Sequence, residues 1–204
     1  MNSQTERRAV PGPAGSIECA IDRPATTPRG LALVCHPHPQ FGGTMDNKVV
    51  QTLARACVQS GYTSVRFNFR GIGASEGNWD EGRGEIDDAR AVLSALHSAG
   101  QPLVLCGFSF GAYVASQVAR GLLEAGTPAA KLILVGPAVV NFVVAAVPAG
   151  TLVVHGEADE VVPLAAVLDW ARPQQQPVVV FPGVGHFFHG QLTPLRALAA
   201  HGLI

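Results

Sequence analysis

Residues 103–111 read Leu-Val-Leu-Cys-Gly-Phe-Ser-Phe-Gly, and this stretch is the most informative one about the fold. A short apolar run typical of a strand ends in Gly-Phe-Ser-Phe-Gly, and a helical pattern begins at once. Glycines two positions before and after Ser109 remove the Cβ atoms that would collide with neighbouring backbone in so tight a turn. The turn would hold the hydroxyl clear of the sheet at a helix N-terminus, where developing negative charge is stabilised. Ser109 is therefore a candidate nucleophile.

A nucleophilic serine needs a base and an orienting acid, and two later segments offer them. Asp159 follows an apolar run at 151–155, and His186 lies on a glycine-rich loop after a second run at 177–181. If these runs are parallel strands, all three side chains lie beyond carboxyl ends of strands, where open α/β sheets place their sites. The chain order Ser, Asp, His is also the order associated with such a strand-to-helix turn.

Two glutamates compete with Asp159 for the role of the acid. Glu157 and Glu160 lie within two residues of it in the segment His-Gly-Glu-Ala-Asp-Glu-Val-Val-Pro, residues 155–163. We favour Asp159 because it occupies the acid position in the pattern His-Gly-x-x-Asp-x-Val-Val-Pro, and we expect the two glutamates to be solvated.

Five segments, each placed after a predicted strand, carry a family resemblance. They are His-Pro-His-Pro at 36–39 with Gly-Gly-Thr-Met at 42–45, Asn-Phe-Arg-Gly-Ile-Gly-Ala-Ser-Glu-Gly at 68–77, the serine turn at 107–111, the acid segment at 155–163, and Gly-His-Phe-Phe-His-Gly at 185–190. With these segments the chain resembles the α/β-hydrolase superfamily from about residue 30 onward, in particular its small lid-less serine hydrolases. The resemblance implies hydrolysis of an ester, thioester or amide through an acyl-enzyme, and no particular substrate. Relatives often carry an acidic residue directly before the base histidine, where this chain has Gly185.

A serine hydrolase also needs backbone N–H groups that bind the oxyanion of the tetrahedral intermediate. One should be the amide of Phe110, the residue after the nucleophile. The second should come from the loop after the strand predicted at 31–36. Both prolines of His-Pro-His-Pro lack an N–H, so within that segment we favour the amide of His38, with Gln40 and Phe41 as alternatives.

Other functions for these loops are less well supported. His36 and His38 could begin a metal site, but the adjoining loop adds only Asp46, too few ligands for a complete set. The glycines at 71 and 73 do not continue into the Gly-x-Gly-x-x-Gly pattern of a nucleotide loop. We expect Arg70 to bond loop carbonyls and carboxylates as scaffold. We expect neither a metal nor an organic cofactor.

The composition agrees with one enzyme-sized domain. The chain has 204 residues, of which 48% are hydrophobic and 14% charged, as suits a buried parallel sheet. Its formal charge is −1, which favours neither nucleic acid nor an anionic membrane surface. No apolar segment follows the charges of the first residues, and four cysteines show no Cys-x-x-Cys spacing. We expect buried free thiols and a cytoplasmic location.

Strand and helix patterns alternate along the chain, which predicts an α/β fold with a mostly parallel sheet and helices on both faces. We expect residues 1–15 to be a flexible lead-in and 16–204 to form the α/β-hydrolase domain. Only about 14 residues separate the runs at 131–136 and 151–155, too few for a cap domain. The expected strands are 16–22, 31–36, 62–68, 102–107, 131–136, 151–155 and 177–181, and the expected helices are 46–60, 85–99, 109–123, 164–170 and 192–201.

From these observations we expect a serine hydrolase that cleaves small carboxylic esters or thioesters, with Ser109, His186 and Asp159 as its triad. Phe41, Phe110, Phe142 and Phe187 are candidates for an apolar lining of the site. The same triad could instead transfer an acyl group to another acceptor, as in acyltransferases and perhydrolases. A non-catalytic binding protein with this fold is a further alternative.

Overall fold

The apolar runs form strands of one eight-stranded sheet in a computed structural model that describes residues 5–204. Every predicted strand is present, with each end within one residue of the prediction. An additional strand, β1, precedes them. The strands are β1 (Glu6–Gly12), β2 (Gly15–Asp22), β3 (Gly30–Cys35), β4 (Tyr62–Phe67), β5 (Leu103–Phe108), β6 (Lys131–Val135), β7 (Leu152–Gly156) and β8 (Val178–Phe181).

The strand order across the sheet is β1-β2-β4-β3-β5-β6-β7-β8. From β4 to β8 every neighbouring pair is parallel, whereas β2 pairs antiparallel with both β4 and β1. The predicted α/β fold with a mostly parallel sheet is thereby confirmed. Since β5 lies centrally, the turn that follows it lies between the loops after β3 and β6.

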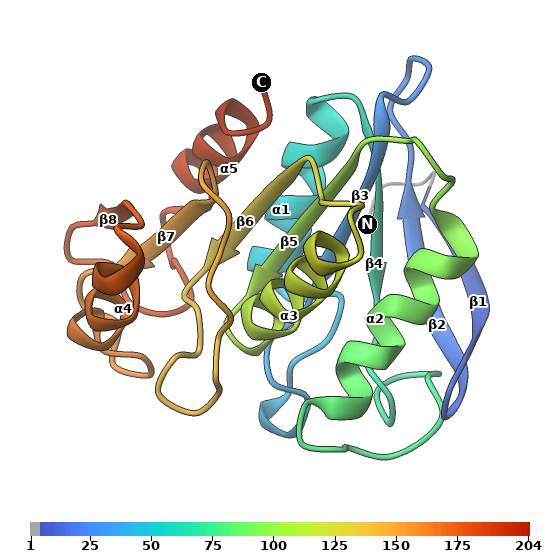
Figure 1. Cartoon of the computed structure of the whole chain (residues 1–204), viewed down its shortest axis with the longest axis horizontal. Helices are drawn as coiled ribbons and strands as arrows, with labels where there is room; N and C mark the ends of the chain where they lie inside the picture. Colours follow the sequence, from blue (N-terminus) through green and yellow to red (C-terminus); the bar gives the residue numbers. More distant parts are fainter. Residues whose placement is uncertain (1–4) are drawn as a thin grey trace.

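Helices cover both faces of the sheet (Figure 1). One face packs against α2, α3 and α4, and the other against α1 and α5. Each face buries its own apolar cluster, since parallel sheets require cover on both sides. The helices are α1 (Lys48–Gln59), α2 (Arg83–Leu96), α3 (Phe110–Glu124), α4 (Leu164–Ala171) and α5 (Leu192–His201), with short 3₁₀ turns η1 (Pro39–Phe41) and η2 (Arg172–Gln174).

The N-terminal strand β1 corrects the expectation of a flexible segment over residues 1–15. Glu6–Gly12 pairs along its whole length with β2, in a register that runs from Glu6 opposite Ile21 to Gly12 opposite Gly15. Only Val10 of this strand is buried, so its sequence lacks the apolar alternation that marks a strand. Residues 1–4 of the predicted segment lie outside the described residues.

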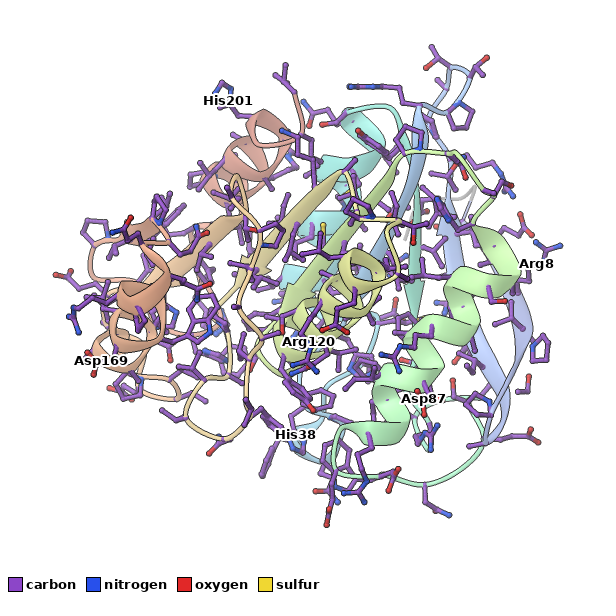
Figure 2. The ribbon with its side chains drawn as sticks, in the orientation of Figure 1. Arg8, His38, Asp87, Arg120, Asp169 and His201 are labelled. Carbon is purple, nitrogen blue, oxygen red and sulfur yellow. The ribbon has the colours of Figure 1, made fainter. Side chains whose placement is uncertain are left out.

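The loops that follow β3, β4 and β6 lie along the same edge of the sheet, the lower edge in Figure 1. His38 marks this edge in Figure 2, whereas His201 of α5 lies at the opposite end of the molecule. Between the end of β6 at Val135 and the start of β7 at Leu152 the chain forms no helix or strand. The expectation that the chain has no cap domain is thus confirmed. Within residues 5–204, no helix has the length and apolar character needed to cross a membrane.

Candidate active site

Ser109 lies in the turn between β5 and α3 with a backbone conformation that side chains rarely adopt. Its φ is 56° and its ψ is −117°. Such a conformation costs about 1–3 kcal/mol and persists only where the surroundings enforce it. The Ser109 amide donates to the carbonyl of Val135 at 2.9 Å, and its carbonyl accepts from the amide of Ala112 at 3.0 Å. These bonds fix the serine between the end of β6 and the first turn of α3.

Close backbone contacts explain the two glycines of this turn. A Cβ atom on Gly107 would lie 2.1 Å from the carbonyl oxygen of Gly111, and one on Gly111 would lie 2.2 Å from that of Cys35. Both distances are far below van der Waals contact, and all the obstructing atoms belong to the backbone. The glycines therefore allow α3 to start directly against the ends of β5 and β3.

The structure brings Ser109, His186 and Asp159 together in one hydrogen-bonded chain. His186 Nε2 lies 3.0 Å from Ser109 Oγ, and His186 Nδ1 lies 2.7 Å from Asp159 Oδ2. All three residues are buried, at 5–7% exposure, although Ser109 and His186 are 77 positions apart in the chain. The ring of His186 packs on Phe108 of β5, with ring centres 5.0 Å apart. His186 and Asp159 thus approach Ser109 from loops that follow neighbouring strands.

The carboxylate of Asp159 is held by its own loop. Its Oδ1 accepts hydrogen bonds from the amides of Val161 at 2.9 Å and Val162 at 2.8 Å, which leaves Oδ2 to face His186. Burial by itself would raise the pKa of Asp159, but the hydrogen bonds from His186 and Val162 outweigh it and hold that pKa below its usual value. Asp159 is therefore ionised and can stabilise a protonated imidazole.

The competing glutamates point elsewhere. Glu157 accepts a hydrogen bond from the amide of Gly183, so it helps to hold the loop that carries His186. Glu160 is exposed and lines a cavity of about 500 Å³ beside His186, together with His189 and Gln191. Asp159 alone of the three acids contacts His186.

The two backbone amides predicted to bind an oxyanion are both free. Neither Phe110 nor His38 donates its backbone N–H to any group in residues 5–204. Phe110 is the first residue of α3, and His38 directly precedes η1. Their side chains are in contact, with ring centres 5.2 Å apart, so the two loops that carry these amides meet beside Ser109. Gln40, one alternative donor, has its amide bonded to His38 Nδ1.

Several known proteins are similar to this chain. Residues 26–143, more than half of the chain, match the model of a family described as "Serine aminopeptidase, S33". A serine hydrolase without a lid from Xanthomonas campestris is 38% identical and superimposes with a TM-score of 0.88 over 100% of this chain and 95% of its own. The chain belongs to the α/β serine hydrolase family.

Two further proteins are similar to this serine hydrolase. An α/β serine hydrolase homologue from Coxiella burnetii is 41% identical, with a TM-score of 0.87 over 98% of this chain and 97% of its own. An uncharacterized protein from Rickettsia prowazekii is 46% identical over 111 residues. That match spans 52% of this chain and about half, 46%, of the Rickettsia protein.

Aromatic rings surround the loop after β3 in this serine hydrolase. The half-buried imidazole of His38 contacts the rings of Phe41, Trp79, Phe110 and Phe142, with ring centres 4.6–5.8 Å apart. Phe110 itself is fully buried, so its ring supports the loop from below and does not line an open surface. Phe41 is 85% exposed and Phe187, on the His186 loop, is 46% exposed. The prediction that Phe110 lines the site is therefore wrong.

His36 and Arg70 are structural members of the hydrolase site. His36 is fully buried; its Nδ1 bonds the carbonyl of Pro37 at 2.6 Å, and its Nε2 accepts from the amide of Phe69 at 3.0 Å. Both nitrogens are occupied, so His36 ties the loop after β3 to the end of β4 and has no free nitrogen for a metal. Arg70 makes a bidentate ion pair with Asp88 and also bonds the carbonyl of Gly84, as the prediction of a scaffold role requires.

One buried residue of the site escapes sequence reasoning. His155 of β7 lies behind Asp159, with its Nε2 3.5 Å from Asp159 Oδ2. Its place in the motif directly before Gly156 was the available signal, but a histidine inside an apolar strand is commonly a packed core residue. Among the described residues, no group of three or more histidine, cysteine or acidic side chains has an arrangement suited to hold a metal ion.

Proposed function

We propose that this serine hydrolase cleaves small carboxylic esters or thioesters through an acyl-enzyme formed on Ser109. The observation that carries the proposal is the continuous chain of short hydrogen bonds from Ser109 Oγ through His186 to Asp159 Oδ2. A hydroxyl, an imidazole and an ionised carboxylate in this order make up the apparatus of nucleophilic acyl transfer.

In the first step, Ser109 Oγ attacks the carbonyl carbon while its proton passes to His186 Nε2. Asp159 keeps the other proton on Nδ1 and stabilises the imidazolium that forms. The tetrahedral intermediate then collapses, and the leaving alcohol or thiol takes the proton from His186. Water repeats the sequence on the acyl-enzyme, which releases the acid and restores the serine.

The free amides of Phe110 and His38 are the groups that we assign to the oxyanion. Phe110 begins α3, so the positive end of the helix dipole adds to its N–H. Loss of one such donor costs roughly 10²- to 10³-fold in kcat in other enzymes of this chemistry.

The surroundings support a small substrate. The connection between β6 and β7 is a loop without a cap, so the site is not enclosed by a second domain. A cavity of about 500 Å³ adjoins His186 and is lined partly by Val161, Phe187 and His189. It offers room for one side of an ester next to the group that protonates the leaving atom.

Labelling with a fluorophosphonate tests this proposal. The natural protein should gain one adduct on Ser109, and Ser109→Ala should gain none. Ser94→Ala removes an exposed serine of α2 and should label like the natural protein. The untreated protein should hydrolyse 4-nitrophenyl esters, with higher kcat/KM for short than for long acyl chains, and prior labelling should abolish this activity. Absence of both labelling and ester turnover would leave a binding protein of this fold.

A further inference from the structure

His155 is a buried histidine that the proposed reaction does not use. It is the penultimate residue of β7 (Leu152–Gly156), and its side chain is fully buried. Asp159 lies four positions after it in the chain, and the turn between them carries the carboxylate to His186. Its position therefore lies directly behind the acid of the triad.

The hydrogen bonds of His155 determine which nitrogen carries its proton. Nε2 lies 2.8 Å from the carbonyl oxygen of Val162, which can only accept, so Nε2 is the donor. Nδ1 is buried and has no partner in the part of the chain that the structure describes. Burial lowers the pKa of His155, against the opposing influence of the Val162 bond and the charge of Asp159. The ring is thus neutral, with one proton that points at the acid loop.

The proton on His155 Nε2 links β7 to Val162, at the end of the turn that carries Asp159. Val162 is bonded on both sides of its backbone: its carbonyl accepts from His155, and its amide donates to Asp159 Oδ1. The same His155 nitrogen lies 3.5 Å from Asp159 Oδ2, the oxygen that receives His186 Nδ1. Asp159 and His186 are the titratable groups whose charges act on His155.

We propose that His155 is a positioning residue that holds the Val162 carbonyl and thereby fixes the Asp159 carboxylate in line with His186. This inference rests on the proposed function, since it assigns His155 to the orientation of the same acid. A fully buried imidazole in an otherwise apolar strand would be replaceable by an apolar side chain of similar size if it served packing alone. The positioning role instead requires the N–H group.

A matched pair of variants separates the two roles. The glutamine side chain of His155→Gln keeps an N–H group at about the distance that Nε2 reaches. The methionine side chain of His155→Met has a similar length and no hydrogen-bond donor. We expect kcat of the Met variant to fall about tenfold, with KM within about twofold of the natural value. A displacement of a catalytic group by about 1 Å lowers the rate about a hundredfold, and here the turn is only loosened, so the loss should be smaller. The Gln variant should retain kcat within about threefold of the natural protein.

The proton NMR signal of His186 Nδ1–H gives a second readout. A proton held between imidazole and carboxylate resonates far downfield, so this signal should broaden or vanish in the Met variant and persist in the Gln variant. A lower melting temperature in the Met variant, with natural kcat and an intact signal, would overturn the positioning role. Fluorophosphonate labelling of the natural protein keeps the two questions apart, because a failure to label Ser109 refutes the proposed function itself.

The unmodified protein offers a test that needs no variant to fold. Nitrogen-15 NMR of the histidines should show His155 protonated on Nε2 alone at neutral pH, and it should become a cation only at a lower pH than an exposed histidine does. A His155 that carries its proton on Nδ1, or that becomes a cation at neutral pH, would refute the hydrogen bond to Val162 on which the inference depends.

Discussion

Substitution of Gly111 by alanine should disable the enzyme while most of the fold persists. The added Cβ would lie 2.2 Å from the carbonyl oxygen of Cys35 and 2.6 Å from that of His36. Both obstacles are backbone atoms of the β3 end and its loop, so no side chain can rotate away. Relief requires α3 and β3 to separate.

The required separation sets the size of the effect. Ordinary contact begins near 3.4 Å, so the obstructing atoms must give way by about 1.2 Å from 2.2 Å. This movement would separate the amide of Phe110, on α3, from that of His38, on the loop after β3. A misplacement of about 1 Å costs on the order of a hundredfold in rate. We therefore expect kcat/KM of Gly111→Ala to fall about a hundredfold, and stability to fall by about 1–3 kcal/mol through overpacking.

Hydrolysis of 4-nitrophenyl acetate and a thermal melt measure the two effects. Gly121→Ala, in the same helix, is the matched control, because its Cβ would meet only the end of the Arg90 side chain at 3.2 Å. That variant should keep natural activity and gain up to about 1 kcal/mol from helix propensity. Natural activity in Gly111→Ala would refute the idea that the contact of α3 with β3 sets the site geometry.

Two further predictions follow from the acid and from a buried histidine. Asp159→Asn should lower kcat by about 10³- to 10⁴-fold in steady-state assays, because an amide facing His186 Nδ1 favours the wrong tautomer of His186. A loss below tenfold would argue against Asp159 as the acid. Burial lowers the pKa of His36 to about 3, well below the value of about 6.5 in an unfolded chain. Between these values the unfolded state binds a proton that the folded state does not, so stability declines as the pH falls. Urea denaturation should show the free energy of unfolding about 2 kcal/mol lower at pH 5 than at pH 7. This difference should shrink in His36→Gln. Equal stability of the natural protein at both pH values would contradict the lowered pKa of His36.

The sequence predicted the central strands well because each is buried on both faces. Runs such as Leu103–Phe108 and Lys131–Val135 are almost wholly apolar, and glycines or prolines bound them. The strand Glu6–Gly12 was missed for the opposite reason. It lies at the edge of the sheet, exposes most of its side chains and is held by backbone bonds to β2, which no side-chain pattern reports.

The candidate site was predictable where a residue stands in a short motif at a strand end. Ser109, Asp159 and His186 each do, and the structure brings them within hydrogen-bond distance. The surroundings of His155 and Phe110 depend on contacts that lie outside their own short motifs. His155 reaches Val162 around a turn, and the ring of Phe110 is buried between loops from distant segments. Such contacts follow from the conformation and the packing of the loops, which the local pattern does not contain.

The order of the triad along the chain affects the protein during its synthesis. The nucleophile turn follows β5, whereas His186 is made 77 residues later and reaches the serine only once β7 and β8 have joined the sheet. At about 5–20 residues per second, a ribosome needs about 4–15 s to cover that interval. Under the proposed mechanism Ser109 has no base during this interval, so we expect it to stay unreactive until the sheet is complete.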